Sequence, residues 1–120
     1  MNLKSFSYAF DGLKDLCSGR HKNAMFHLFF TAIVLVLSFL FSLSKEEFLW
    51  IILWISLVLA AEAFNTAIEY ITDLASPDIH PLAKKTKDMS AAAVLLISFG
   101  AFICGIIIFI PKIYTLLAYA

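Results

Sequence analysis

Three long apolar runs dominate the pattern of hydrophobic and polar positions along the chain. They cover residues 24–43, 49–71 and 90–110, and about 20 apolar residues in helical conformation are enough to cross a bilayer. Because backbone polar groups within lipid must pair with one another, we expect each run to be a membrane-spanning α-helix. The remaining sequence is too short for a second domain. The pattern therefore predicts an all-α membrane protein with a single domain over residues 1–120.

A stretch ahead of the first run, residues 3–18, has a different pattern. Apolar residues recur there at steps of three and four, and charged residues fill the opposite face. This spacing is typical of an amphipathic helix, which can lie in the membrane interface with its aromatic side in the lipid. Packing against the other helices would leave the same pattern, so periodicity alone does not choose between the two. The apolar positions are Leu3, Phe6, Phe10, Leu13 and Cys17.

Local signals mark the ends of the second and third runs. Ser44 followed by Glu47 is a capping-box pattern that can begin the second helix. The Ser-Pro pair at 76–77 ends it, since proline cannot continue the helical ladder and disfavours helix at the residue before it. We expect Pro81 to begin a helix that continues into the third run, and Pro111 to close that run.

Polar side chains occur where lipid is expected. The second run carries Glu62, Asn65 and Glu69, and Asp73 follows in the same phase. Steps of three and four keep all four on one helix face. A charge near the bilayer centre costs about 2.5–3.5 kcal/mol or more, so it is rare without a partner or a function. These residues could bond to neighbouring helices, line a proton or cation path, or form a reaction site.

The link between the second and third runs, residues 72–89, is basic. It contains Lys84, Lys85 and Lys87, with Asp88 next to the last of them. Four of the nine basic residues precede the first run and three lie in this link, so the positive-inside rule places the N-terminus and the link in the cytoplasm. Topology alone explains part of the cluster. Acids beside lysines at a membrane surface also suit a phosphate held together with Mg²⁺, which is what phosphoryl transfer requires.

Composition narrows the chemistry further. Hydrophobic residues make up 62% of the chain and the formal net charge is zero, and this apolar share is well above that of a typical soluble domain. Neither of the common glycine-rich nucleotide motifs, G-x-x-x-x-G-K-[ST] and G-x-G-x-x-G, is present. ATP would therefore have to be bound in some other way, and we expect no nucleic-acid partner.

Three short segments form one long composite motif. Residues 62–73 read E-A-F-N-T-A-I-E-Y-I-T-D, residues 80–83 read H-P-L-A, and residues 87–94 read K-D-M-S-A-A-A-V. Together they closely resemble the signature of the prokaryotic diacylglycerol kinase family. The resemblance implies a small homotrimer in the bacterial cytoplasmic membrane, with three transmembrane helices and a surface helix in each subunit. It also implies composite sites between subunits, where the γ-phosphate of MgATP passes to a lipid alcohol.

The resemblance assigns roles to the acidic stripe. Glu62 would be the general base for the lipid hydroxyl, and Asn65 would position the phosphate or the hydroxyl. Glu69 would bind the Mg²⁺ that bridges the ATP phosphates. One departure concerns His21, which stands where the family usually has a second metal-binding glutamate. Either His21 or a water replaces that acid, or a second metal is held more weakly.

The resemblance also assigns residues to the nucleotide. Lys87 would neutralise phosphate charge and help to position the phosphate. Asp73 and Asp88 would contact the nucleotide, and Lys4 and Tyr8 would line the nucleotide site from the surface helix.

The acceptor follows from a smaller signal. Residues 80–84 read H-P-L-A-K, which resembles the branch of the family that phosphorylates undecaprenol, whereas the diacylglycerol branch more often reads H-E-L-S there. We therefore expect undecaprenol as the acceptor, with diacylglycerol as the alternative. An alternative of another class is a non-enzymatic, ion-conducting membrane oligomer that uses the same acids, although such a protein needs neither the lysine-aspartate pair nor the surface helix.

Overall fold

The fold is built from four α-helices within the part of the chain that the structure describes. The computed structural model describes residues 2–119. The helices are α1 (Leu3–Leu16), α2 (Lys22–Leu40), α3 (Lys45–Ala75) and α4 (Pro81–Ala118). Helices α2, α3 and α4 are long and apolar enough to cross a membrane. The prediction of an all-α protein with three spanning helices and a shorter helix before them is confirmed.

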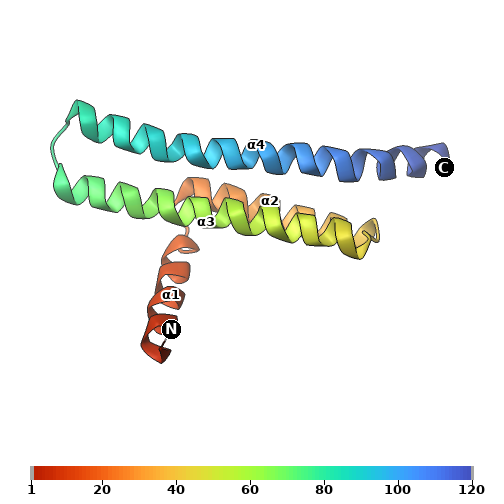
Figure 1. Cartoon of the computed structure of the whole chain (residues 1–120), viewed down its shortest axis with the longest axis horizontal. Helices are drawn as coiled ribbons and strands as arrows, with labels where there is room; N and C mark the ends of the chain where they lie inside the picture. Colours follow the sequence, from red (N-terminus) through yellow and green to blue (C-terminus); the bar gives the residue numbers. More distant parts are fainter. Residues whose placement is uncertain (1, 120) are drawn as a thin grey trace.

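The three long helices lie side by side, and α1 stands across them (Figure 1). Helix α3 packs against both α2 and α4 and is also the helix that α1 contacts. A small apolar core of Ile51, Ile108 and Phe109 closes the end of the bundle away from the α3–α4 link. Because α3 lies at the centre of these contacts, its polar stripe faces other helices rather than a single open surface.

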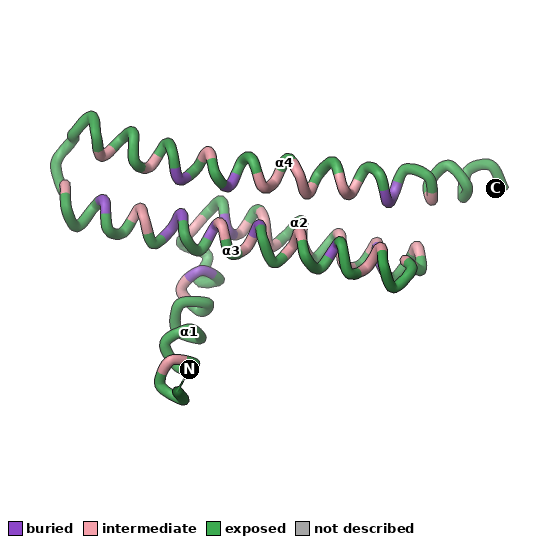
Figure 2. Tube along the Cα trace, in the orientation of Figure 1, coloured by how far each residue is buried: buried purple, intermediate pink, exposed green. Residues whose placement is uncertain are grey.

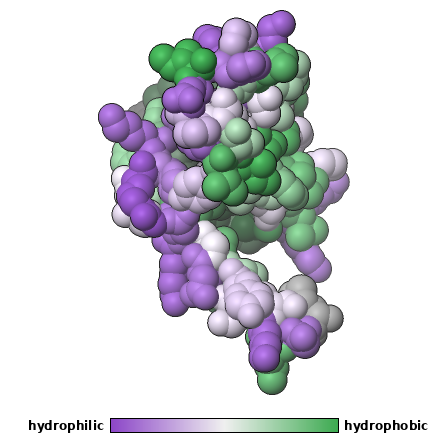
Figure 3. Space-filling model, turned by 90° about the vertical axis from the view of Figure 1, so that its left-hand side faces the viewer, coloured by the Kyte–Doolittle hydropathy of each residue, from purple (hydrophilic) through white to green (hydrophobic). Residues whose placement is uncertain are grey.

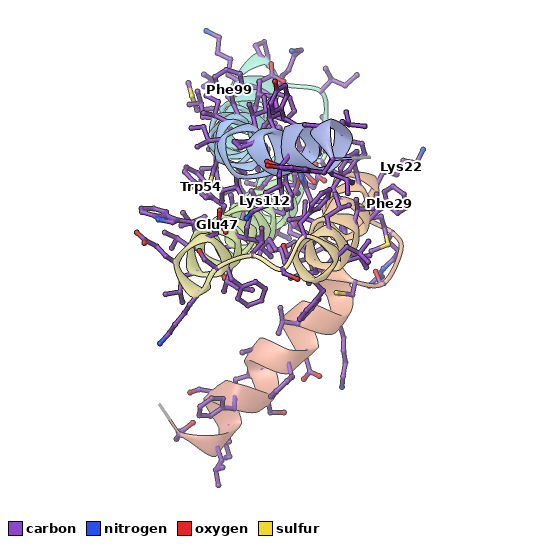
Figure 4. The ribbon with its side chains drawn as sticks, turned by 90° about the vertical axis from the view of Figure 1, so that its right-hand side faces the viewer. Lys22, Phe29, Glu47, Trp54, Phe99 and Lys112 are labelled. Carbon is purple, nitrogen blue, oxygen red and sulfur yellow. The ribbon has the colours of Figure 1, made fainter. Side chains whose placement is uncertain are left out.

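Most side chains of the long helices face outward. Exposed residues predominate along the whole trace (Figure 2), and they include large apolar groups such as Phe29 on α2 and Phe99 on α4, which are 63% and 62% exposed (Figure 4). Apolar surface of this extent would be an aggregation hazard in water. It is the expected exterior of a protein whose solvent is lipid.

The boundaries of α3 follow the expected local chemistry. The Ser44 hydroxyl accepts a hydrogen bond from the Glu47 amide at 3.2 Å, and the Glu47 carboxylate accepts one from the Ser44 amide at 2.8 Å. The predicted capping box is therefore confirmed. Helix α3 ends at Ala75 immediately before the Ser-Pro pair, and α4 begins at Pro81, which occupies the first helical turn. Both termini agree with the sequence signals.

The expectation that Pro111 closes the last helix is wrong, because α4 continues through it to Ala118. A proline inside a helix removes one backbone hydrogen bond and costs about 3 kcal/mol. Two contacts lie next to the proline. The Thr115 hydroxyl donates to the Pro111 carbonyl at 2.9 Å, and Lys112 forms an ion pair with Glu47 of α3 at 3.0 Å (Figure 4). Unpaired backbone in or near lipid would cost more than the proline does.

A polar elbow joins α1 to the bundle. Gly19 supplies a positive φ of 81° at the bend, a conformation that glycine adopts without steric cost. The Tyr70 hydroxyl of α3 donates to the Asp15 carboxylate at 2.6 Å and lies 3.1 Å from His21 Nε2. Arg20 forms an ion pair with the same carboxylate. The hydrogen bond from Tyr70, together with the Arg20 charge, lowers the pKa of Asp15 below its ordinary value.

Candidate active site

The polar stripe of α3 runs from the interior of the bundle to its surface. Glu62 and Asn65 are buried, with 2% and 4% of their surface exposed. Glu69, two turns along from Glu62, is half-buried, and Asp73 is exposed. Solvent exposure therefore increases along the stripe. The deeper residues are enclosed by α2 and α4, and the outer ones reach the end of the bundle.

The deepest member, Glu62, meets a histidine from α2. His27 Nε2 lies 3.2 Å from Glu62 Oε1. The histidine side chain is 17% exposed and the glutamate side chain 3% exposed, so the contact is almost sealed from solvent. A buried carboxylate without a partner is strongly unfavourable. His27 is the side chain that faces this buried carboxylate from the neighbouring helix.

A chain of polar contacts links the next two residues of the stripe to α4. The Asn65 amide nitrogen donates to Glu69 Oε1 at 3.2 Å. The Ser90 hydroxyl donates to Asn65 Oδ1 at 2.6 Å and also lies 2.9 Å from the Lys87 carbonyl oxygen. The amide oxygen of Asn65 accepts from Ser90 and its nitrogen donates to Glu69. These two hydrogen bonds fix the orientation of the amide, because a flipped amide would satisfy neither. The sequence places these groups on separate helices, and packing of α3 on α4 connects them.

Charged pairs occupy the open end of the site. Lys87 of α4 forms an ion pair with Asp73 of α3, across the link between the two helices. Lys84 pairs with Asp88 one turn away on the same helix, with 2.5 Å between nitrogen and oxygen. All four side chains retain substantial exposure. Hydrophilic surface gathers at this end of the molecule (Figure 3), so these ion pairs can exchange partners with an incoming anion at little cost.

Two cavities meet at the deep end of the stripe. The smaller has a volume of about 200 Å³ and is lined by Glu62, Asn65, His27 and Ser98 among others. The larger, of about 410 Å³, extends between α2, α3 and α4 with an almost wholly apolar lining that includes Trp54. His27 and Ser98 belong to both linings, so the cavity lined by Glu62 and Asn65 lies next to the apolar one.

The structure brings some of the predicted residues together and leaves others apart. Asn65 is hydrogen-bonded to Glu69 and lines the same small cavity as Glu62, and Lys87 pairs with Asp73 farther along the stripe. The other predicted site residues lie elsewhere in the chain. Asp88 pairs with a lysine of its own helix, His21 belongs to the elbow, and Lys4 and Tyr8 are exposed on α1, which leads away from the bundle (Figure 1).

Sequence reasoning missed the partners of the stripe. His27 was available as the one titratable residue in the first apolar run, and its position one turn inside that run is the only signal it gave. Ser90 lies three residues after Lys87 and so shares its helix face. Tyr70 gave no signal, because an aromatic residue near a membrane surface is ordinary.

One carboxylate of the stripe could serve as a ligand for Mg²⁺. Within residues 2–119, no group of three histidine, cysteine or acidic side chains is close enough to enclose a metal ion. Mg²⁺ needs only one or two protein carboxylates, with substrate phosphates and water as its other ligands. Glu69 is a half-buried carboxylate near the lysine pairs and meets that requirement.

The fold and the site define a class: a small helical membrane protein that holds carboxylates and an amide between its spanning helices, beside exposed lysine–aspartate pairs. The model of the prokaryotic diacylglycerol kinase family matches residues 7–109. The chain is 38% identical over 110 residues to an undecaprenol kinase of Bacillus subtilis (strain 168). The aligned region covers 92% of this chain and 89% of that protein. It is 36% identical over 106 residues to a diacylglycerol kinase of Helicobacter pylori (strain J99), which covers 85% and 80% respectively. No solved structure gives a significant match.

The chain therefore belongs to the prokaryotic diacylglycerol kinase family. It is a lipid kinase, and ATP is the phosphate donor that such an activity implies. The resemblance read from the sequence is confirmed. The alternative of a non-enzymatic, ion-conducting oligomer gives way to the kinase.

Proposed function

We propose that the protein transfers the γ-phosphate of ATP to a membrane lipid alcohol in a Mg²⁺-dependent reaction, with undecaprenol as the preferred acceptor. One observation carries the proposal. Glu62 and Asn65 line a small cavity that shares His27 and Ser98 with a larger apolar cavity, and Asn65 is hydrogen-bonded to Glu69. A hydroxyl at the end of a hydrocarbon chain is the substrate that such a junction suits.

The reaction divides between the deep and the open end of the stripe. At the deep end, Glu62 takes the proton from the lipid hydroxyl as its oxygen attacks the γ-phosphorus. The bond between the γ-phosphorus and the bridging oxygen breaks, and ADP leaves with that oxygen. At the open end, Glu69 would hold Mg²⁺, which neutralises charge on the phosphates when bound. Lys87 would leave its ion pair with Asp73 and bind the phosphate instead. Its positive charge would then neutralise negative charge on the phosphoryl group that is being transferred.

Asn65 connects the two ends. Its amide nitrogen points to Glu69 and its oxygen is held by Ser90, so the side chain is fixed beside the position that the phosphate would occupy. Fixed positioning is the main contribution that a protein makes to phosphoryl transfer. We assign Asn65 to positioning of the phosphate or the hydroxyl.

Undecaprenol is favoured by the H-P-L-A-K sequence at 80–84 and by the likeness to a protein named undecaprenol kinase. The apolar cavity beside Glu62 offers hydrocarbon surroundings for the start of the acceptor chain. Diacylglycerol is the competing acceptor, because other relatives are named diacylglycerol kinases.

We further propose that the protein works as a homotrimer in the bacterial cytoplasmic membrane, with its N-terminus in the cytoplasm and sites shared between subunits. Ala60, Ala63 and Ala67 form an exposed stripe on α3, and small side chains let membrane helices approach closely. Because α1 leads away from its own bundle, we assign Lys4 and Tyr8 of one subunit to the site of another.

The test measures transfer of labelled phosphate from ATP to undecaprenol and to diacylglycerol in parallel detergent micelles, with and without Mg²⁺. We expect Mg²⁺-dependent transfer and a kcat/KM at least about tenfold higher for undecaprenol, which corresponds to about 1.4 kcal/mol of transition-state stabilisation. A preference for diacylglycerol would reverse the acceptor assignment. Folded protein that transfers phosphate to neither alcohol would refute the proposal.

The metal assignment has its own pair of variants. Glu69→Ala should abolish turnover while the oligomer still forms, whereas Glu46→Ala, an exposed acid at the opposite end of the same helix, should keep normal turnover. An active Glu69→Ala enzyme would remove the assignment of Glu69 to magnesium. Size-exclusion chromatography with light scattering on the same samples reports whether three copies assemble.

A further inference from the structure

Among the described residues, one titratable side chain makes an ion-pair contact with Glu62, and it comes from another helix. His27 Nε2 lies 3.2 Å from Glu62 Oε1. No other side chain in residues 2–119 forms a hydrogen bond or ion pair with this carboxylate. The polar chain through Asn65 and Ser90 passes beside it without including it.

The contact restricts a side chain that would otherwise rotate. The carboxylate end of a glutamate has a broad torsional preference, so its two oxygens are not placed by rotamer alone. Helix α2 is an apolar helix of 19 residues, and His27 is its one titratable side chain deep in the bundle. Fixing Oε1 from α2 leaves Oε2 for whatever enters the small cavity that both residues line.

We propose that His27 is a positioning residue for the kinase reaction, which acts by holding Glu62 Oε1 so that Oε2 faces the acceptor hydroxyl. This inference rests on the proposed role of Glu62 as the general base. A base must lie within hydrogen-bonding distance of the proton that it removes. A displacement of about 1 Å in such a group can lower the rate about a hundredfold.

A purely structural role for His27 makes a different prediction. A residue that only stabilises the bundle would change the amount of folded protein and its thermal stability, with turnover per folded molecule unaltered. A positioning residue changes kcat at constant folded fraction. It leaves the KM for MgATP nearly constant, because the nucleotide would bind at the open end of the stripe.

The first experiment compares His27→Ala, His27→Gln and the matched control Phe29→Ala on the outward face of the same helix (Figure 4). We expect His27→Ala to lower kcat about 10- to 100-fold with the KM for MgATP changed less than about twofold. His27→Gln should recover most of the rate, because its amide nitrogen can take the place of Nε2. Phe29→Ala should keep wild-type kcat. Equal losses in the alanine and glutamine variants would overturn the proposal, as would wild-type turnover in His27→Ala.

A double-mutant cycle tests whether His27 acts through Glu62. Glu62→Asp withdraws the carboxylate from the histidine, so adding His27→Ala to it should cost much less than it costs the wild type. The same fold-loss in both backgrounds would show that His27 acts independently of Glu62 and would refute the inference. If His27→Ala does not fold, His27→Asn replaces it, since its shorter side chain stops before the carboxylate.

A further variant separates this inference from the function on which it rests. Glu62→Gln should be inactive in an otherwise folded, Mg²⁺-dependent kinase. Full turnover in Glu62→Gln would refute the assignment of the base and this inference with it. An inactive Glu62→Gln combined with a fully active His27→Ala would refute the role of His27 and leave the proposed function standing.

Discussion

Removing the Ser90 hydroxyl tests the connection between α3 and α4 at the site. Ser90 is 8% exposed and Asn65 is 4% exposed, and 2.6 Å separates the hydroxyl from Asn65 Oδ1. Ser90→Ala leaves that buried acceptor without its donor. The amide cannot simply flip to compensate, because its oxygen would then face the carboxylate of Glu69.

The magnitude follows from burial. An unsatisfied buried polar group costs about 1–3 kcal/mol, and alanine returns about 0.5 kcal/mol through its better helix propensity. The net loss of about 0.5–2.5 kcal/mol should lower the melting temperature by about 2–10 °C in a chain of this size. If the whole loss fell on the orientation of Asn65 in the transition state, kcat would drop about 2- to 70-fold.

The assay combines thermal unfolding in detergent, followed by circular dichroism, with turnover at saturating MgATP. Ser56→Ala is the control, since the Ser56 hydroxyl donates only to the Ile52 carbonyl of its own helix, at 2.8 Å. That carbonyl keeps its backbone hydrogen bond when the hydroxyl is removed. Should Ser90→Ala be as stable and as active as Ser56→Ala, the hydrogen bond does not hold Asn65 and the reasoning is wrong.

Three further predictions concern other parts of the fold. Ser44→Ala removes half of the capping box that it shares with Glu47, so thermal unfolding should show a loss of about 0.5–2 kcal/mol, and equal melting temperatures would contradict this. Gly100→Ala places a methyl group 2.5 Å from the Trp54 ring, so the ring or the helices must shift. We expect a destabilisation of about 1–3 kcal/mol, with tryptophan fluorescence reporting the displacement, and an unchanged spectrum and stability would refute the contact. Because the folded pKa of Asp15 is lowered, its contribution to anchoring α1 is complete above the unfolded value and is lost as pH falls through the folded one. The protection factors of the α1 amides, which correct exchange for its intrinsic pH dependence, should therefore fall only in acid, and an equal fall near neutral pH would show another cause.

The sequence by itself determined the helices and the chemistry of the stripe. An apolar run long enough to cross the bilayer is stable in lipid as an α-helix, because its backbone groups must pair with one another. Local signals such as the capping box and Pro81 act over three or four residues, so they can be read without knowledge of the fold. The period of an α-helix then places Glu62, Asn65 and Glu69 on one face without knowledge of any neighbour. The family resemblance was readable for the same reason, since its motif lies almost entirely within two helices and their link.

Only the tertiary structure decided what that face meets. It paired Glu62 with His27, joined Asn65 to Ser90 and attached α1 through Tyr70. It also carried α4 through Pro111, where a local rule predicted an end. These outcomes depend on the packing of helices that are distant in sequence, and helical periodicity records only which side chains share a face. The choice of partner belongs to the packing, because a buried charge or amide must be satisfied by whichever helix lies against it.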